Sequence, residues 1–143
     1  MQRIDRHRIE TAPNKVRLTL ETRIADLDMQ GHVNNGAGIT MLQEARARFN
    51  SALGLNGLTF QRRALIAGIQ VEYVREMHHP APVEIETAVV EMGRTSFTMG
   101  QIARQNGQPT LYGETVVVMA DEHGPTELPT DMREGYARHM ACS

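Results

Sequence analysis

Residues 34–54 read NNGAGITMLQEARARFNSALG and carry the strongest structural signal in the chain. Their apolar side chains recur at steps of three and four, which places them on one stripe of a helix of about five turns: Ile39, Leu42, Ala45, Phe49 and Leu53. Asn34 or Asn35 can cap its start, because a short side-chain acceptor satisfies free amides of the first turn. Gly54 follows where helices commonly end in a left-handed residue. We therefore expect one long amphipathic helix.

Strands are expected on both sides of this helix. Before it, residues 16–24 (VRLTLETRI) alternate between apolar and polar side chains, which is typical of a strand with one buried face. After it, strands are expected around 69–73, 83–89, 97–103 and 113–120. Asn106-Gly107 predicts a hairpin because both residues tolerate positive φ, and 92–94 predicts the turn before it. A single helix followed by hairpins indicates an α+β fold, an antiparallel sheet of about five strands packed against that helix.

Length and composition favour a single domain. The chain has 143 residues, with no internal repeat and no linker that would divide it, so one domain spanning 1–143 is expected. A short helix is predicted after Pro129, with Asp131 as its cap and Glu134 three residues later.

Charge and cysteine content exclude several classes of protein. The formal net charge of −2 leaves no basic footprint for nucleic acid. Cys142 is the single cysteine, so a disulfide scaffold is excluded and a reducing compartment fits. The longest apolar run, 116–120, is far shorter than the ~20 residues of a membrane span, and the first ten residues lack the apolar core of a signal peptide. We expect a cytoplasmic protein that binds neither nucleic acid nor membranes.

The densest polar cluster is the segment ADLDMQGHVNN, residues 25–35, just before the helix. One interpretation is calcium binding, because D-x-D-x-Q-G opens like an EF-hand loop. The twelfth position is Ala37, however, where a bidentate Glu is required, and a strand precedes the loop. A second interpretation is structural, since Asp and Asn cap helices and Gly permits turns. It explains Gly31 and the two asparagines better than it explains two carboxylates and a histidine.

A third interpretation of this cluster is a reaction centre. A carboxylate near the positive end of a helix stands beside free backbone amides that can polarise a substrate carbonyl. The carboxylate then attacks that carbonyl or deprotonates water, while the amides stabilise the developing oxyanion. From the residues alone, this interpretation and the structural one are equally well supported. His78 and His79 are a poor pair of metal ligands, because neighbouring strand side chains point to opposite faces, and no metal site is expected.

The same segment, DLDMQGHVNN (26–35), followed by Glu44-Ala45-Arg46, resembles the signature of the hotdog-fold acyl-CoA thioesterases of the 4-hydroxybenzoyl-CoA thioesterase type. Three later segments are similar to that family in order and spacing: VEYVRE (71–76), VEIET (83–87) and GRTSFT (93–98). The resemblance covers about residues 14–121 and leaves 122–143 as a C-terminal tail. It implies the hotdog fold, in which the sheet wraps around the central helix.

The resemblance also implies catalytic roles for three residues. Asp28 matches the family's essential carboxylate, which acts as nucleophile or general base. The backbone amide of Asn35 matches the group that polarises the thioester carbonyl, and His32 matches a histidine that assists the same chemistry. Asp26 is interpreted as structural, orienting the loop.

Five further residues are expected to contact the substrate by the same resemblance: Gly31, Gly38, Arg94, Thr95 and Ser96. Relatives usually carry an aromatic side chain where this chain has Gly38, so we expect an enlarged acyl pocket. Arg94 is a candidate for the phosphates of coenzyme A. Thr95 and Ser96 fall where similar proteins bring a neighbouring subunit's strand toward the ligand, although an ordinary turn and strand explain these three residues equally well.

The function that the resemblance implies is hydrolysis of an acyl-CoA to a free acid and coenzyme A. No metal or redox cofactor is implied, since coenzyme A is part of the substrate, and a homodimer or homotetramer is expected. The alternatives are a hotdog dehydratase or hydratase acting on acyl thioesters, and a non-catalytic acyl-CoA-binding protein. Neither the acyl group nor the choice between coenzyme A and acyl-carrier protein follows from the sequence.

Overall fold

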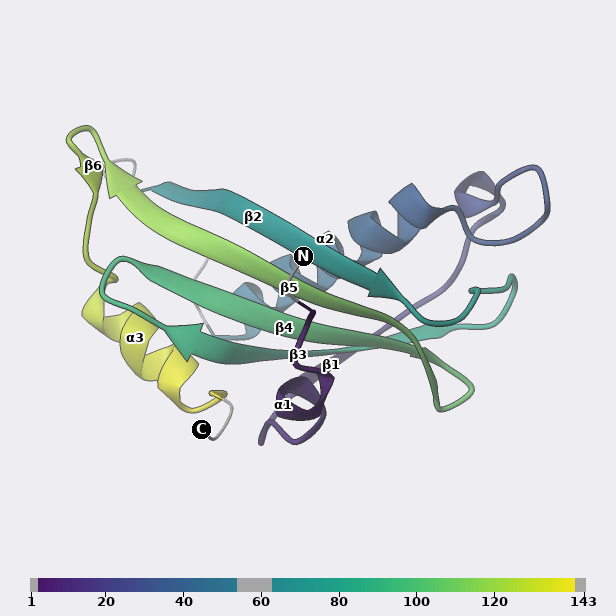
Figure 1. Ribbon diagram of the computed structural model, residues 1–143, viewed down its shortest axis with the longest axis horizontal. Helices are drawn as coiled ribbons and strands as arrows, with labels where there is room; N and C mark the ends of the chain where they lie inside the picture. Colours follow the sequence, from purple (N-terminus) through teal and green to yellow (C-terminus); the bar gives the residue numbers. More distant parts are fainter. Residues whose placement is uncertain (1–2, 54–62, 141–143) are drawn as a thin grey trace.

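An antiparallel sheet forms most of the computed structural model, which describes residues 3–53 and 63–140 (Figure 1). Its strands follow the order β1-β3-β4-β5-β2, with the short β6 paired to β5. Their bounds are β1 Val16–Leu20, β2 Arg63–Tyr73, β3 Val83–Met92, β4 Ser96–Gln105, β5 Gln108–Asp121 and β6 Gly124–Pro125. The helices are α1 Arg6–Glu10, the 3-10 turn η1 Ile24–Asp26, α2 Asn35–Ala52 and α3 Thr130–Ala137.

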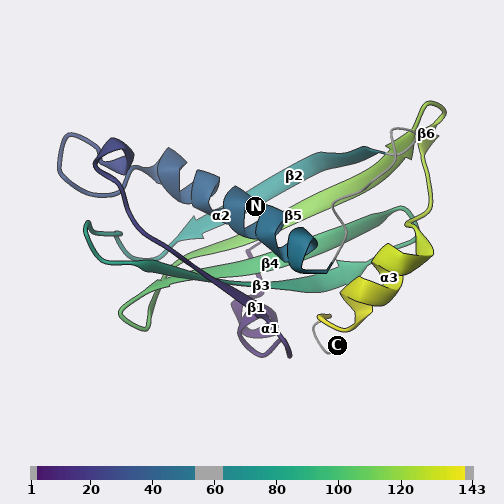
Figure 2. The same ribbon diagram turned by 180° about the vertical axis from the view of Figure 1, so that it is seen from behind.

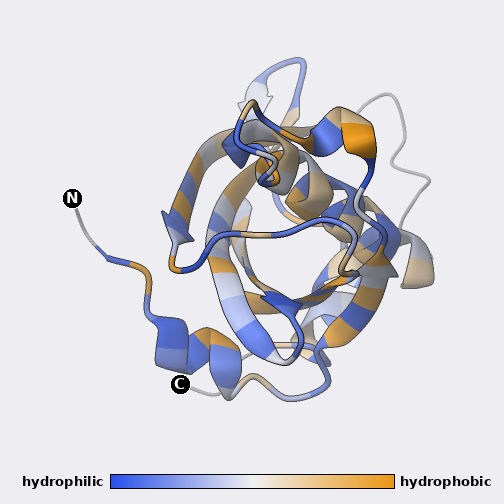
Figure 3. Ribbon diagram, turned by 90° about the vertical axis from the view of Figure 1, so that its right-hand side faces the viewer, coloured by the Kyte–Doolittle hydropathy of each residue, from blue (hydrophilic) through white to orange (hydrophobic). Residues whose placement is uncertain are grey.

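The central helix α2 lies along the concave face of this sheet (Figure 2), and the strands curl around it when viewed from the end (Figure 3). Asn34 is its N-cap, and the Asn34 side chain accepts a hydrogen bond from the Gly36 amide at 2.7 Å. The helix ends at Ala52 with Leu53 as C-cap, whereas Gly54 lies outside the described residues. The long helix, the antiparallel sheet and the α+β hotdog architecture are therefore confirmed.

The side chains buried between α2 and the sheet form two hydrophobic clusters. Near the helix start, Met41, Leu42 and Ala45 pack against β3, β4 and β5. Near its end, Phe49 packs against those strands and against three side chains beyond them in sequence: Leu128, Met132 and Tyr136. The buried core therefore extends beyond residues 14–121, because α3 closes its far end.

Two local predictions differ from the structure, and one helix was missed. The first strand ends at Leu20, not at residue 24, because the Asp26 carboxylate accepts the Arg23 amide at 2.9 Å and folds the chain into η1; Ile24 is 79% exposed as a result. The helix after Pro129 is present, but Asp131 is not its cap; it lies in the first turn and accepts the Met132 amide. The helix α1 was not predicted.

The turn predicted at Asn106-Gly107 is confirmed, and the turn predicted at 92–94 is present one residue later, at 93–95. Asn106 and Gly107 have φ angles of 53° and 76°, the left-handed values that a two-residue hairpin of this kind requires. The turn at 93–95 is closed by the Gly93 amide, which donates to the Ser96 carbonyl at 2.7 Å. These short connections place β3, β4 and β5 side by side and fix their antiparallel register.

The edge strand β2 exposes apolar side chains on the face that it shares with α2. Ile66 and Ile69 pair in register with Val117 and Thr115 of β5, which point toward the interior, yet they are 52% and 46% exposed. The helix covers the middle of the sheet but not this edge. Among the described strands β2 pairs with β5 alone, and an edge strand bearing apolar side chains is a template for association with another chain.

Candidate active site

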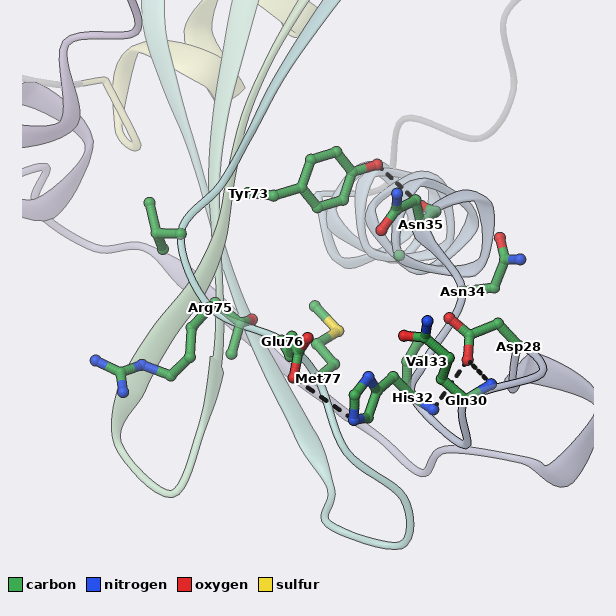
Figure 4. Close-up of a pocket in the computed structure, with 13 residues that line it drawn as sticks. Asp28, Gln30, His32, Val33, Asn34, Asn35, Tyr73, Arg75, Glu76 and Met77 are labelled. Carbon is green, nitrogen blue, oxygen red and sulfur yellow. Dashed lines mark hydrogen bonds and ion pairs between the residues drawn. The ribbon is translucent and has the colours of Figure 1, made fainter.

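A cavity of about 460 Å³ opens at the N-terminal end of α2. It lies between the loop that enters the helix and the segment that leaves β2, so residues more than 40 positions apart in sequence share it (Figure 4). The lining residues from the loop and helix are Asp28, Gln30, His32, Val33, Asn34, Asn35 and Gly38. Those from β2, the segment after it and β5 are Tyr73, Val74, Arg75, Glu76, Met77 and Thr110.

The Asp28 carboxylate is held in a fixed orientation by its own loop. Its Oδ1 accepts the backbone amides of Gln30 at 2.9 Å and His32 at 3.1 Å, while the Asp28 amide donates to the His32 carbonyl. Gly31 has a φ of 80°, the left-handed conformation that this tight loop requires. Gly31 does not line the cavity. Its position in the structure is that of a residue that shapes the loop. The second carboxylate oxygen, Oδ2, has no hydrogen-bond partner among residues 3–53 and 63–140.

The start of α2 brings the backbone amide of Asn35 to the same cavity. The Asn34 side chain occupies the Gly36 amide, and the Asn34 carbonyl accepts the Gly38 amide at 3.2 Å. The Asn35 amide has no acceptor within the described part of the chain, so it is available to a ligand. On the opposite wall, the Tyr73 hydroxyl donates to the Asn35 carbonyl at 3.0 Å and ties β2 to the first turn of the helix (Figure 4).

His32 lies on the wall of the cavity beside the end of β2. Its Nε2 is 3.5 Å from Oε2 of Glu76. The imidazoles of His32 and His78 pack edge to face, with ring centres 5.1 Å apart. The backbones of His32 and His78 also form an isolated bridge. The loop and the segment after β2 are thus joined through both backbone and side chains, which fixes His32 relative to the cavity.

Asp26 does not line this cavity, and its hydrogen bonds lie within the loop. Its buried carboxylate accepts hydrogen bonds from the backbone amide and the guanidinium of Arg23, both at 2.9 Å. The hydrogen bond from the Arg23 side chain holds the pKa of Asp26 below its ordinary value. The Asp26 carbonyl also accepts the Asn34 amide at 2.7 Å, which anchors the N-cap of α2.

Gly38 lies on the floor of the cavity, one turn into α2. A Cβ atom placed on it would stand 3.3 Å from Cδ2 of Leu111, so the backbone of the helix approaches β5 closely here. The position therefore lies between the cavity and β5.

Arg94 and Thr95 lie in the turn between β3 and β4, and Ser96 is the first residue of β4. All three are at the opposite end of the sheet, beside α3 (Figure 1). Arg94 forms an exposed ion pair with Glu127 at 3.6 Å, and the Thr95 carbonyl accepts the Met119 amide at 2.8 Å. Within one chain these residues do not join Asp28 and Asn35. Their expected contact with substrate therefore requires a second copy of the chain.

Tyr73 and Glu76 were missed as site residues by the sequence analysis. They belong to the segment VEYVRE, which was noted only as a strand at the expected spacing. The available signal was the position of this segment at the end of a strand, because side chains at strand ends commonly meet at one edge of a sheet. Their partners His32 and Asn35 are about 40 residues away in sequence, so the pairing itself could not be read from the chain.

The described residues contain no group of three or more His, Cys, Asp or Glu side chains that could hold a metal ion. None of the helices described here has the length and apolarity needed to cross a membrane.

Comparison with known proteins identifies the family to which this fold and cavity belong. Residues 22–135 match the model of the thioesterase-like superfamily, so the chain is a member of that superfamily. A predicted thioesterase from Bacillus stearothermophilus is similar in structure, with a TM-score of 0.80 and 26% identity over 90% of this chain and 98% of the other.

Two further relatives extend this comparison. A thioesterase from Thermus thermophilus, solved with coenzyme A and zinc, has a TM-score of 0.78 and 29% identity over 89% of this chain and 93% of its own. The uncharacterized protein YsmA of Bacillus subtilis (strain 168) is 25% identical over 114 residues, 78% of each chain. The relatives place this chain among thioesterase-like proteins without identifying a substrate for it.

Proposed function

We propose that the protein hydrolyses an acyl-CoA to a free acid and coenzyme A, as the 4-hydroxybenzoyl-CoA thioesterases that it resembles do. The observation that carries this proposal is the shared cavity, in which an oriented carboxylate and the free amide at the start of α2 face the same space. Asp28 is the catalytic carboxylate, Asn35 supplies the oxyanion donor and His32 assists at the carbonyl. The reaction needs no resident metal or redox cofactor, and we expect it to take place in the cytoplasm.

Two routes are compatible with this geometry. In the first, Asp28 takes a proton from water as the water oxygen bonds to the carbonyl carbon, and the carbonyl oxygen becomes an oxyanion held by the Asn35 amide. The C–S bond then breaks, and the proton passes to the sulfur of coenzyme A. In the second, a carboxylate oxygen attacks the carbonyl carbon directly and coenzyme A leaves as a thiolate. Water then hydrolyses the mixed anhydride to the free acid and the Asp28 carboxylate, and a proton from that water passes to the thiolate.

Support for a coenzyme A ligand comes from the Thermus thermophilus relative, which was solved with coenzyme A. The cavity is lined by polar groups around Asp28 and by apolar groups that include Val33, Val74 and Met77. An acyl group can pack against these apolar residues while a large polar carrier stays outside.

The missing side chain at Gly38 gives a prediction about acyl size. Gly38→Tyr should lower kcat/KM most for the bulkiest acyl-CoAs, because the added ring would occupy part of the cavity that Gly38 lines. Gly38→Ala is the matched control, since it also raises helix propensity, by about 1 kcal/mol, but adds a single methyl group. Steady-state kinetics with short, branched and aromatic acyl-CoAs measure the effect, and an equal loss across all acyl sizes would contradict it.

We further propose that the active form is at least a homodimer, built through β2, with a homotetramer as the larger possibility. The exposed Ile66 and Ile69 on this free edge support that arrangement, because a second copy would cover them. A second copy is also the means by which Arg94, Thr95 and Ser96 could reach a neighbouring cavity.

Ile69→Lys should shift the protein toward monomer, because a charged ammonium cannot be buried in an apolar interface without a large desolvation cost. Thr19→Lys is the matched control, since Thr19 is exposed on β1, the edge strand at the other side of the sheet. Light scattering coupled to size-exclusion chromatography measures the mass of each form. A wild-type monomer at every concentration, or dimers of equal stability in all three proteins, would refute assembly through β2.

The test of the activity is a panel of acyl-CoAs incubated with the purified protein, with release of free thiol as the readout. Hydrolysis releases coenzyme A and supports the proposal. A dehydratase or hydratase would change the acyl chain and leave the thioester intact, which mass spectrometry of the acyl-CoA detects. Binding without turnover would indicate an acyl-CoA-binding protein. Either of the last two results overturns the hydrolase assignment.

A further inference from the structure

Arg46 is a buried cation without an acidic partner. It lies on the sheet-facing side of α2, is 8% exposed, and has a pKa lowered by burial. All 17 Asp and Glu side chains of the chain fall within residues 3–53 and 63–140, and none of them forms an ion pair with it. Its Nη1 donates a hydrogen bond to the neutral side-chain oxygen of Gln101 at 3.2 Å.

Gln101 is fixed so that its oxygen faces this guanidinium. It is fully buried, and its Nε2 donates to the Leu42 carbonyl at 3.0 Å and to the Thr87 hydroxyl at 3.1 Å. A guanidinium has five N–H donors, so one amide oxygen satisfies a small part of its capacity. Burying a charge is costly unless it is paired, and an anion is the partner that offsets this cost most fully.

A second cavity of about 100 Å³ lies against Arg46. Its walls are largely apolar and come from β2, β4, β5 and α3, with Asn50 as a second polar group: Ala64, Ile66, Phe97, Met99, Val117, Met132 and Tyr136. The Asn50 side-chain oxygen accepts the Tyr136 hydroxyl at 2.6 Å, which leaves its amide nitrogen without an acceptor among the described residues. At about 30 Å³ for each water-sized group, the space holds a small polar group and part of a hydrocarbon chain.

We propose that this second cavity binds a carboxylate attached to a hydrocarbon group, with the guanidinium of Arg46 and the Asn50 amide as donors to its oxygens. The apolar walls pack against the hydrocarbon next to the carboxylate. A guanidinium matches a carboxylate through two parallel N–H···O bonds, which a single amide oxygen cannot offer. The site is separate from the Asp28 cavity, because Gly38 and Arg46 are eight residues apart on α2, about 12 Å along the helix.

Two sources can supply such a carboxylate. One is a free carboxylic acid that binds on its own. The other is an acyl-CoA whose acyl chain ends in a second carboxylate, with its thioester at Asp28 and its far end at Arg46; this source rests on the proposed hydrolase function. The shared chemistry is a carboxylate on an apolar chain, and the experiments below separate the two sources.

The primary test is the binding of hexanoate compared with neutral hexanamide, measured by calorimetry on the full-length protein. We expect the wild-type protein to bind hexanoate at least tenfold more tightly. Arg46→Gln removes the charge but keeps a donor for Gln101, and it should abolish this preference, whereas Arg46→Lys should retain part of it. Arg75→Gln makes the same substitution in the first cavity and should leave the preference intact.

A second measurement needs no variant. Addition of hexanoate to the wild-type protein should shift the NMR signals of the Gln101 side-chain amide, which touches Arg46. Absence of that shift, no preference for hexanoate in the wild type, or a preference that survives in Arg46→Gln would each overturn the proposal and leave a cavity that holds water only. None of these measurements depends on thioester hydrolysis. The hydrolase function can therefore be refuted while the Arg46 site is confirmed, and the Arg46 site can be refuted while the hydrolase function is confirmed.

The source is then identified by kinetics with octanoyl-CoA and 7-carboxyheptanoyl-CoA, which differ only at the far end of the chain. If the carboxylate belongs to the substrate, the ratio of kcat/KM for the second compound to that for the first should fall at least tenfold in Arg46→Gln. An unchanged ratio, together with hexanoate binding that requires Arg46, assigns the site to a free acid.

Discussion

Asp28→Asn is expected to lower kcat for thioester hydrolysis by about 10²–10⁴-fold, the range for removal of a general acid or base. The neutral amide can neither take a proton from water nor attack the carbonyl as a carboxylate does. Its side-chain oxygen can still accept the Gln30 and His32 amides, so the loop should keep its conformation. Release of free thiol from saturating acyl-CoA measures the effect.

Asp121→Asn is a suitable control for this variant. The Asp121 carboxylate also accepts the amide two residues ahead, from His123 at 2.8 Å, but it lies outside the cavity. It should keep wild-type kcat, and both variants should unfold within a few degrees of the wild type. Near-normal turnover in Asp28→Asn would contradict the role assigned to this carboxylate, whatever its effect on KM.

Phe49→Ala is expected to lower the free energy of unfolding by about 3–5 kcal/mol, the usual cost of deleting a buried aromatic ring. Phe49 is completely buried on α2. Its ring centre lies 6.0 Å from that of Tyr136 and 5.4 Å from that of His139, so the ring connects the central helix to the C-terminal segment. Urea denaturation followed by circular dichroism measures the loss.

Arg48→Ala on the same helix serves as the comparison. Arg48 is exposed and pairs with Glu44 at 3.0 Å, an arrangement that contributes about 0.3–0.5 kcal/mol. If the two variants lost similar stability, the ring of Phe49 would not be the contact that holds α2 and α3 together.

The sequence predicted the elements whose signal is local. The apolar stripe that predicted α2 repeats from Ile39 to Leu53. The same side chains stabilise the helix by packing on the sheet, so the pattern appears in the local sequence. The first half of β2 lacked such a signal, since a register shift between Ile66 and Gly68 interrupts the alternation. The helix α1 has only five residues and is held by long-range packing of Ile9 on the outer face of the sheet, which no local pattern reports.

The residues of the candidate site likewise include some that a local motif shows and some that only the fold brings together. Asp28, His32 and Asn35 lie within eight consecutive residues, so a motif could place them together at the helix start, and the structure brings all three to one cavity. Tyr73 and Glu76 reach it only because β2 is the last strand in the sheet and ends beside α2. Arg46 was quoted only as part of a motif, because burial without a counter-charge is a property of the packed interior.

The packing of α1 on the outer face of the sheet affects how well fragments of this protein can be expected to remain soluble. Gly100 leaves room for that helix, since a Cβ there would stand 2.8 Å from Cγ1 of Ile9. A fragment trimmed to the family-matched residues 22–135 would lose α1 together with β1. The apolar patch beneath α1, including Ile102, and the backbone edge of β3 would then be uncovered, both of which promote aggregation. Purification tags and truncations are therefore better tolerated when residues 3–20 are left in place.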